Sequence, residues 1–394
     1  MKVNISEIRF VNEYYPRDGF DNETVNSYML NLSKLPPIVV TKDKVLVDGY
    51  HRLLAHRLAG ASEIEAEVID IPPDRILLEA AKRNSLHGKQ LTRSEKQRLA
   101  RQLYRSNHVT LGEISNVLAV SEATLSNWLK DLIIQEKEEL RKQIIDLYLQ
   151  CYTQEEIANK TGVSQGRVSQ IISKFKAEKI NDPPVPESLQ LFNVWYFPKR
   201  DTRFGLEMEG AIPGQIIENI LYYYTEPFDK VVDPMAGGGT TVDVCKAMYR
   251  RYLAYDINPK RDDVKRHDIR EGYPPEAKSC DLIFLDPPYY NMVFNLFSSI
   301  GEFYSFIKKL ARDSYATVKD QGVVALLMAD WTEGERYCLS GECYRIFTEA
   351  KFTFVDHVSC PQSTEQAAPQ QIEYAKRERK LLGRNRDLYV FKKV

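Results

Sequence analysis

Two stretches in the C-terminal half of the chain carry residue types that could act on a bound molecule. The first, Asp286-Pro-Pro-Tyr289, follows an apolar run and combines an acid, two prolines and an aromatic ring. The Asp286 carboxylate and the Pro287 carbonyl can each accept one hydrogen of an amino group, and the prolines remove competing N–H donors. The Tyr289 ring offers a face on which an unstacked base could lie. This stretch is suited to orienting an exocyclic amino group for nucleophilic attack.

The second stretch, residues 231–241, reads as a buried strand, a turn with three consecutive glycines and a helix start. Such a turn lets the backbone approach a ligand closely, and the helix N-terminus favours polar or anionic groups. Asp256 follows the turn at the spacing expected of a carboxylate that binds a ribose diol, a feature that dinucleotide dehydrogenases share. The turn lacks both the GxGxxG spacing and a Walker lysine, which argues against a pyrophosphate ligand.

The elements that must position these stretches alternate between strands and helices. Expected strands are 230–233, 252–256, 282–285, 322–328 and 386–392, and expected helices are 212–224, 240–250 and 303–310. Apolar strands that alternate with helices indicate a doubly wound parallel sheet. Ligands of such sheets bind at the carboxyl ends of the strands, where the acids of both stretches fall.

Together the two stretches resemble the cofactor and catalytic motifs of the S-adenosylmethionine-dependent amino-group DNA methyltransferases, over most of residues 195–394. The resemblance implies S-adenosylmethionine as cofactor and no metal. Its cofactor-binding residues would be Asp233, Pro234, Met235, Gly237, Gly239, Thr240, Asp256, Asp268 and Ile269. Its catalytic residues would be Asp286, Pro287, Pro288 and Tyr289. Met235 stands where the family usually has phenylalanine. An aspartate at the start of the catalytic motif favours adenine N6, and cytosine N4 is the alternative.

Two related blocks lie in the middle of the chain. Residues 110–129 align with residues 153–172, and seven of twenty positions are identical. Each block opens with a threonine followed three residues later by a glutamate, which is a helix-capping pattern. Gly162 supplies the left-handed turn residue of the second block, and Ala119 occupies that place in the first. This is typical of a helix-turn-helix, whose second helix enters the major groove of DNA. A plain packing pair of helices is the alternative.

The outward residues of the second helix in each block are the predicted DNA contacts. Arginine and glutamine can pair bidentately with base edges, and serine, threonine and asparagine can also donate and accept there. The candidates are Ser121, Thr124, Asn127, Gln165, Arg167 and Gln170. The polar and basic stretch 362–386 is expected to be either a target-recognition loop that contacts phosphates or a surface loop.

The N-terminal segment shows a hairpin at 38–47, a helix from Asp48 to Leu58 and a strand at 64–71. Its Tyr15-Pro-Arg17, Leu35-Pro-Pro-Ile-Val-Val40 and Asp48-Gly-Tyr-His-Arg52 stretches resemble the ParB/sulfiredoxin-like fold, and Leu91-Thr-Arg-Ser-Glu-Lys96 resembles the DNA-binding half of ParB-like proteins. Members of the superfamily bind nucleotides through the box that corresponds to Asp48–Arg52. The resemblance therefore implies that Gly49, His51 and Arg52 could bind a phosphate. Tyr50 replaces the sulfiredoxin cysteine, and the CTP-box glutamate is missing. A domain that only dimerises or contacts DNA is the alternative.

These features predict a multidomain α/β protein. Its segments are a small α+β ParB-like domain (1–83), all-α helix-turn-helix regions (84–135 and 136–181), a proline-rich linker (182–189) and a Rossmann-like methyltransferase domain (190–394). The length of 394 residues suits several domains. Six cysteines without a CxxC pair, no membrane-length apolar run and no signal-peptide core predict a cytoplasmic protein.

The predicted function is site-specific DNA methylation, with the front domains targeting double-stranded DNA. A homodimer formed through the N-terminal domain and a cognate endonuclease of a restriction–modification system are further candidate partners. The rival hypothesis is a ParB-like DNA-binding, partition or regulatory protein with a secondary methyltransferase domain. A nuclease role for the N-terminal domain is disfavoured because no cluster of metal-binding carboxylates and lysine stands there.

Overall fold

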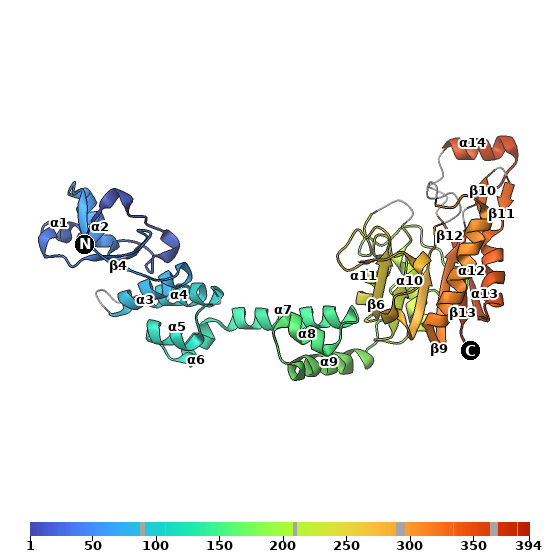
Figure 1. The fold of residues 1–394 in the computed structure, drawn as a ribbon, viewed down its shortest axis with the longest axis horizontal. Coiled ribbons are helices and arrows are strands. Elements are labelled where there is room, and N and C mark those ends of the chain that lie inside the picture. The colour runs from blue at the N-terminus through green and yellow to red at the C-terminus, as the bar shows by residue number, and fades with distance from the viewer. Residues whose placement is uncertain are drawn as a thin grey trace. The chain divides into compact units, whose positions relative to one another are not determined.

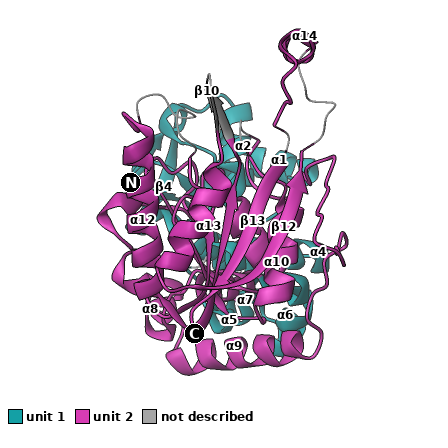
Figure 2. Cartoon of the chain, turned by 90° about the vertical axis from the view of Figure 1, so that its right-hand side faces the viewer, with its two compact units in different colours: residues 1–138 teal, residues 139–394 magenta. Residues whose placement is uncertain are grey.

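A computed structural model describes residues 1–86, 91–106, 108–207, 211–288, 296–333, 335–362, 369–383 and 385–394. The chain forms two compact units, Met1–Glu138 and Glu139–Val394 (Figure 2). The second of the two related blocks, residues 153–172, therefore belongs to the same unit as the large sheet. The five-segment division expected from the sequence stays a prediction. None of the helices in the described ranges combines the length and apolar character that a bilayer span requires.

The first unit begins with a four-stranded sheet in the order β1-β4-β2-β3. Its strand β4 is labelled in Figure 1. Its strands are β1 (Lys2–Asn4), β2 (Ile38–Thr41), β3 (Leu46–Asp48) and β4 (Glu63–Ile69). The expected hairpin is confirmed, because β2 pairs with β3 in antiparallel fashion, while β2 and β4 are parallel. Helices α1 (Asn22–Met29) and α2 (Tyr50–Leu58) complete this α+β part.

The helical remainder of the first unit contains the first of the two related blocks. Its helices are α3 (Ile76–Leu86), α4 (Arg93–Arg105), α5 (Leu111–Leu118), α6 (Glu122–Trp128) and the start of α7 (Lys130–Leu149). Thr110 and Glu113 cap α5 reciprocally, as the sequence pattern predicts. Ala119 adopts the left-handed conformation with φ 48° at the turn, and Ser121 caps α6. Leucine and isoleucine side chains, among them Leu99, Ile114 and Leu125, form the core of this bundle.

The second unit opens with the second block, which repeats this geometry. Helix α8 (Gln154–Thr161) starts at a capping box of Thr153 and Glu156 and ends at Gly162, whose φ is 71°. Ser164 then caps α9 (Gln165–Ile180) by accepting a hydrogen bond from the Arg167 amide. Both copies thus form two helices joined by a short turn, and their identity as DNA-binding helix-turn-helix units stays a prediction.

A seven-stranded sheet in the order β12-β13-β9-β8-β5-β6-β7 forms the centre of the second unit. The strands are β5 (Lys230–Asp233), β6 (Arg251–Asp256), β7 (Lys265–Arg266), β8 (Cys280–Leu285), β9 (Val318–Met328), β12 (Thr353–Pro361) and β13 (Asn385–Lys392). A separate pair, β10 (Trp331–Glu333) and β11 (Glu335–Tyr337), follows β9. Neighbours from β7 to β9 pair in parallel, so their carboxyl ends share one edge.

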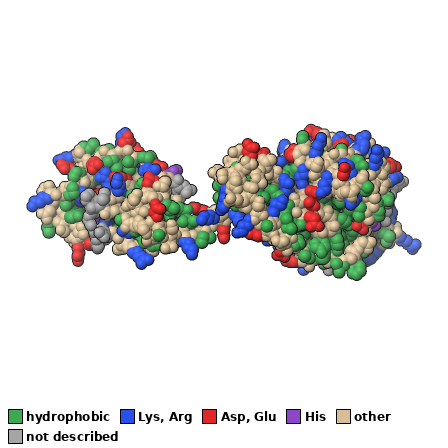
Figure 3. All heavy atoms as spheres, turned by 90° about the horizontal axis from the view of Figure 1, so that it is seen from below, with side chains coloured by type: hydrophobic (Ala, Val, Ile, Leu, Met, Phe, Trp, Pro, Cys, Tyr) green, Lys and Arg blue, Asp and Glu red, His purple; other side chains and the backbone are tan. Residues whose placement is uncertain are grey.

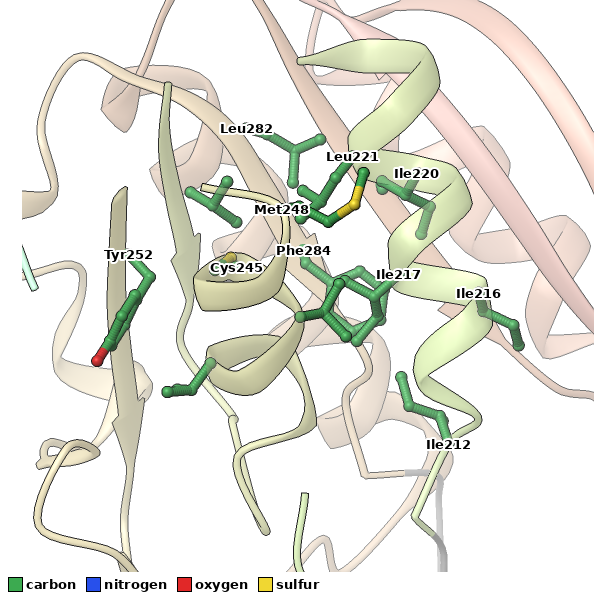
Figure 4. Close-up of a cluster of buried hydrophobic side chains, with 14 of the residues drawn as sticks. Ile212, Ile216, Ile217, Ile220, Leu221, Cys245, Met248, Tyr252, Leu282 and Phe284 are labelled. Atoms are coloured by element: carbon green, nitrogen blue, oxygen red, sulfur yellow. The ribbon is translucent and has the colours of Figure 1, made fainter. Parts of the chain in front are cut away.

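Helices cover both faces of this sheet. Helices α10 (Gly214–Tyr224) and α11 (Thr240–Ala247) bury Ile217, Leu221 and Cys245 against one face, beside Leu282 and Phe284 of β8 (Figure 4). Helices α12 (Ile300–Thr317) and α13 (Leu339–Glu349) bury apolar side chains against the other. This three-layer arrangement is the Rossmann-like fold that the sequence predicts.

The sheet is not parallel throughout, which corrects the sequence-based expectation. Strand β13 runs antiparallel to both β9 and β12. Strand direction is set by the connections, and an apolar run such as residues 386–392 has the same appearance in either direction. The polar stretch 362–386, expected to be a loop, contains the helix α14 (Pro369–Glu378).

The second helix pair, α8 and α9, packs against the amino edge of the large sheet. Phe175 of α9 is buried, with its ring centroid 5.5 Å from Phe228 and 5.4 Å from Tyr249. These two residues lie just before β5 and β6, at the ends of the strands opposite to the acids of interest. Lys179 lies over the Tyr249 ring, and Arg251 lies over Tyr148 of α7. Figure 2 shows α9 across the same end of the sheet as the C-terminus.

Truncation of this contact should destabilise the second unit. We expect Phe175→Ala to lower its free energy of unfolding by about 3 kcal/mol, because the lost ring leaves a cavity between α9 and the sheet. Denaturant titration followed by circular dichroism measures the loss, with Ser173→Ala, an exposed site on the same helix, as the matched control. Equal stability of both variants would contradict the packing described.

Candidate active site

One cavity of about 530 Å³ opens at the carboxyl edge of the large sheet and is lined by both chemical stretches. The predicted cofactor-binding residues that line the cavity are Asp233, Pro234, Met235, Gly237, Thr240, Asp256, Asp268 and Ile269. The predicted catalytic residues that line it are Asp286, Pro287 and Pro288, while Tyr289 lies outside the described residues. The structure therefore brings together residues separated by more than fifty positions in the sequence.

The glycine turn after β5 is held against the end of β6. The Gly237 amide donates to the Asp256 carboxylate over 2.9 Å, and the Ala236 amide donates to the Tyr255 carbonyl over 2.8 Å. The other Asp256 oxygen accepts from the Asn258 amide at 2.8 Å. Asp256 is half-buried and lines the cavity, so its carboxylate stands where it could meet a ligand hydroxyl.

Gly239 lies at the end of this turn, as the N-cap of α11, and is not among the residues that line the cavity. Its φ of 79° lies in the left-handed region, and a Cβ added there would stand 2.8 Å from the Arg261 side chain. Arg261 in turn forms ion pairs with Asp243 and Asp263. This network fixes the start of α11 and thereby the shape of the turn.

Asp233 is the most deeply buried acid of the cavity. Its side chain is 4% exposed and accepts hydrogen bonds from the Met235 amide at 3.0 Å and from the Thr241 hydroxyl at 2.6 Å. Burial raises the pKa of Asp233 to about 7, since desolvation disfavours the charged form and these two hydrogen bonds compensate only in part. A cationic ligand beside this group would favour its ionised form.

Asp268 caps a short 3-10 helix (Ile269–Glu271) in the wall of the cavity. It accepts from the Arg270 amide at 3.0 Å, and the Arg270 guanidinium pairs with its carboxylate at 2.6 Å. That guanidinium holds the pKa of Asp268 below its usual value. The neighbouring His267 contacts the Gly272 carbonyl at 2.6 Å. The wall at this point consists of a paired carboxylate and the buried Ile269.

The catalytic stretch continues β8 into the cavity. Pro287 is buried, and Asp286 and Pro288 are half-buried. Phe284, two residues before Asp286 on the strand, is 2% exposed and lines the same space. Leu296, Phe297 and Phe306 close the cavity with apolar surface near the start of α12. Acceptors and aromatic or aliphatic walls thus stand together, as recognition of a planar amino-bearing ring requires.

The structure also places the predicted DNA and phosphate ligands. Gln165, Arg167 and Gln170 are exposed on α9, and Ser121 and Asn127 are exposed on or beside α6 with Thr124 half-buried. The Ser121 and Thr124 hydroxyls lie 2.8 Å apart. Lysine and arginine side chains are interspersed with acidic ones over the face seen in Figure 3. DNA contact by these residues stays a prediction.

The side chains of the Asp48–Arg52 box form hydrogen bonds and an ion pair within the first unit. Arg52 pairs with Asp48 at 2.6 Å and donates to the carbonyls of Pro36 and Pro37. His51 accepts from the Asp21 amide at 2.9 Å. Gly49 has φ 98°, and an added Cβ would meet Ile38 at 2.7 Å. These contacts support a structural role for the box, and its phosphate-binding role stays a prediction.

Sequence reasoning missed several lining residues. These are Ala211, Ile212, Ala236, Gly238, Thr241, Ile257, His267, Arg270, Phe284, Leu296, Phe297, Phe306 and Arg386. Phe284 could have been found, because alternate residues of a strand share a face and Asp286 lies two positions further. Arg386 stands in an expected strand far along the chain, and no local pattern links it to Asp286.

Comparison with known proteins finds similarity to DNA methylases and to a ParB protein, each over part of the chain. The family model described as DNA methylase matches residues 103–264. The chain is similar to DNA methylases over this stretch. The match includes Asp233, Gly237 and Asp256 and ends before Asp268 and Asp286.

Two relatives match parts of the chain, and one of them is a ParB protein. The transcriptional regulator NovG of Streptomyces niveus is 31% identical over 113 residues, which are 28% of this chain and 36% of that protein. A probable chromosome-partitioning protein ParB of Helicobacter pylori is 27% identical over 147 residues, 35% of this chain and 49% of that protein. The chain thus spans less than half the length of either relative. Both resemblances seen in the sequence, to amino-group DNA methylases and to ParB-like proteins, are confirmed as similarities.

Among solved structures, TrmN of Thermus thermophilus aligns with 47% of this chain and 50% of its own, at 15% identity and a TM-score of 0.33. The DNA methylase match implies S-adenosylmethionine as methyl donor. The cavity fits this group: the glycine turn leaves room at the backbone, Asp256 offers acceptors for ribose hydroxyls, and the buried Asp233 carboxyl lies nearby.

Neutralising Asp233 should flatten the pH dependence of stability. The folded protein keeps a proton on this group up to about pH 7, whereas the unfolded chain loses it near pH 4. The resulting stabilisation is complete below the unfolded pKa and is lost as pH rises through 7. Between pH 6 and pH 8 the wild type should therefore lose about 1.4 kcal/mol in free energy of unfolding through Asp233. Denaturant titrations at both pH values measure this.

Asp233→Asn keeps an acceptor for the Met235 amide and should lack this component. Asp320→Asn is the matched control, because the Asp320 carboxylate is 87% exposed at the start of β9. A wild-type pH dependence that Asp233→Asn leaves unchanged would show that burial does not raise the pKa of this carboxyl.

Proposed function

We propose that the protein transfers the methyl group of S-adenosylmethionine to an exocyclic amino group of a base in double-stranded DNA, with adenine N6 as the target. The observation that carries this proposal is the single cavity in which Asp256, at the end of β6, and Asp286-Pro287-Pro288, at the end of β8, meet. A ribose-binding carboxylate and an amine-orienting acceptor pair in one space fit a methyl transfer to an amino group.

The protein's own residues would act by positioning. Bound S-adenosylmethionine supplies an electrophilic methyl group. Asp286 and the Pro287 carbonyl would accept the two amino hydrogens, which directs the nitrogen lone pair out of the ring and toward that methyl group. Phe284, Phe297 and the neighbouring prolines exclude water, which strengthens these hydrogen bonds. The base must leave the duplex to reach Asp286, and Tyr289 is proposed as its stacking partner.

Adenine is favoured over cytosine by the residue type at the first catalytic position. The resemblance to the methyltransferase family associates aspartate at this position with N6 of adenine. N4 of cytosine presents the same amino chemistry, so identification of the methylated nucleoside decides between the two.

The helix-turn-helix copies would select the DNA. The second copy is fixed to the amino edge of the sheet through Phe175, whereas the cavity opens at the carboxyl edge. Strand β8 has six residues, so the two edges are separated by about 20 Å. Bases read by α9 would then be offset from the methylated base. The ParB-like domain would add DNA contacts or a dimer interface, and a cognate endonuclease would make the protein part of a restriction–modification system.

Removal of the Asp286 carboxylate should abolish methyl transfer. We expect Asp286→Ala to reduce incorporation of labelled methyl into DNA by at least about a hundredfold, since the amino group loses its charged acceptor. The assay uses the full chain, labelled S-adenosylmethionine and DNA, followed by mass spectrometry of the nucleosides. Asp320→Asn should retain activity, because its exposed carboxylate lies at the opposite edge. Activity of Asp286→Ala at the wild-type level would refute the assignment, and a wild type inactive on every DNA would favour the partition or regulatory hypothesis.

Loss of Arg167 should weaken DNA binding selectively. If Arg167 of α9 contacts a base edge, Arg167→Ala should lower target-site affinity by about 1–3 kcal/mol and relax the preference at that position. Fluorescence anisotropy with target and scrambled duplexes measures both effects. Arg345→Ala, which removes an exposed charge on α13, is the matched control. Unchanged affinity and preference in Arg167→Ala would remove α9 as a recognition helix.

A further inference from the structure

Arg386 is a buried cation that faces the cavity without a protein partner for two of its donors. Its side chain is 8% exposed and lines the cavity together with Asp286. The Nε and Nη1 atoms are buried, and neither has a hydrogen-bond partner among the described residues. Buried polar groups are nearly always hydrogen-bonded, and a buried charge without a partner carries a large desolvation cost. A ligand that supplies acceptors would relieve this cost.

A second buried arginine of the same unit shows what a structural guanidinium looks like. Arg250 is 3% exposed and donates from Nε to the Thr225 hydroxyl at 2.9 Å. Its Nη1 and Nη2 atoms donate to the carbonyls of Met248, Leu221 and Thr225 at 2.6–3.1 Å. All three nitrogens of Arg250 therefore have partners within the protein. Arg386 is buried to a similar degree, but its Nε and Nη1 atoms have no hydrogen-bond partner among the described residues. This difference distinguishes Arg386 from Arg250.

The sheet places Arg386 on the side of Asp286 that is remote from the ribose-binding carboxylate. In the strand order, β13 lies two positions from β8 and four positions from β6. With neighbouring strands about 4.8 Å apart, these separations are about 10 Å to the Asp286 strand and about 19 Å to the Asp256 strand. Arg386 also alternates with Leu388 and Val390, which pack on the same sheet face as Phe284. It thus reaches the cavity from the half opposite to the cofactor turn.

We propose that Arg386 binds the nucleotide whose base enters the cavity, by donating hydrogen bonds from Nε and Nη1 to acceptor atoms of that nucleotide. The inference rests on the proposed function, since it deepens the substrate side of the same cavity. Nε and Nη1 lie on different edges of the planar guanidinium, so each would donate to a separate acceptor of the nucleotide, either a phosphate oxygen or an acceptor on the base edge. The phosphate oxygens and the base edge belong to one nucleotide. Comparing deoxyadenosine, which has no phosphate, with its 5′-monophosphate (dAMP) distinguishes these two kinds of acceptor.

The test measures ligand binding to the full chain by calorimetry, independently of methyl transfer. The ligands are S-adenosylhomocysteine alone, and then dAMP or deoxyadenosine added to the S-adenosylhomocysteine complex. We expect Arg386→Met to leave the affinity for S-adenosylhomocysteine within about twofold and to weaken dAMP binding by about tenfold or more. If the phosphate is the acceptor, deoxyadenosine binding should not change. If the base is the acceptor, deoxyadenosine should weaken by a similar factor.

Thermal unfolding separates a binding role from a structural one. Arg386→Met should melt at the wild-type temperature or above it in the absence of ligand, because it removes an unsatisfied buried charge. Arg250→Met is the contrasting control and should melt well below the wild type, because it breaks an internal network. Arg386→Lys keeps the charge and should restore part of the dAMP affinity.

Three results would overturn the proposal. One is a loss of S-adenosylhomocysteine affinity as large as the loss for dAMP, which would assign Arg386 to the cofactor. Another is a clear fall in the melting temperature of Arg386→Met, which would make the residue structural. The third is the absence of any difference in nucleotide binding between Arg386→Met and the wild type, whether both proteins bind the two nucleotides equally or neither binds them. Methyl transfer by a wild type that fails here would leave the proposed function intact.

Discussion

The site depends on the convergence of parallel strands at one edge of the sheet. Strands β5, β6 and β8 run in the same direction, and their carboxyl ends carry Asp233, Asp256 and Asp286. The hydrogen bond from the Gly237 amide to the Asp256 carboxylate joins the first two ends and keeps the turn open toward the ligand space. Without the parallel pairing, acids 23 and 30 residues apart would not line one cavity.

Much of this edge could be predicted from the sequence, because its signals are local. A strand, a glycine turn and a helix start lie within residues 231–241, and the strand 230–233 was placed at its true bounds. The capping residues Thr153 and Ser164 likewise define α8 and α9 through contacts a few residues away. Such motifs involve contacts between residues that are close in the sequence. The residue types alone therefore predict the local structure.

The features that were missed depend on contacts between distant segments. The antiparallel direction of β13 follows from chain connections, and its residues carry no mark of direction. Arg386 enters the cavity only because β13 inserts between β9 and β12, some hundred positions after Asp286. The docking of α9 on the sheet was also not foreseen, because Phe175 has the same spacing as an ordinary core residue of the helix pair.

The two edges of the large sheet hold different parts of the second unit. Aromatic packing at the amino edge fixes the helix-turn-helix, and the carboxyl edge holds the cavity with its acids and Arg386. A crystal structure of the full chain with S-adenosylhomocysteine tests the central claim most directly. We predict that the ribose hydroxyls are hydrogen-bonded to the Asp256 carboxylate and that the sulfur faces Asp286 across the cavity. A ligand bound elsewhere, or one whose ribose lies away from Asp256, would contradict it.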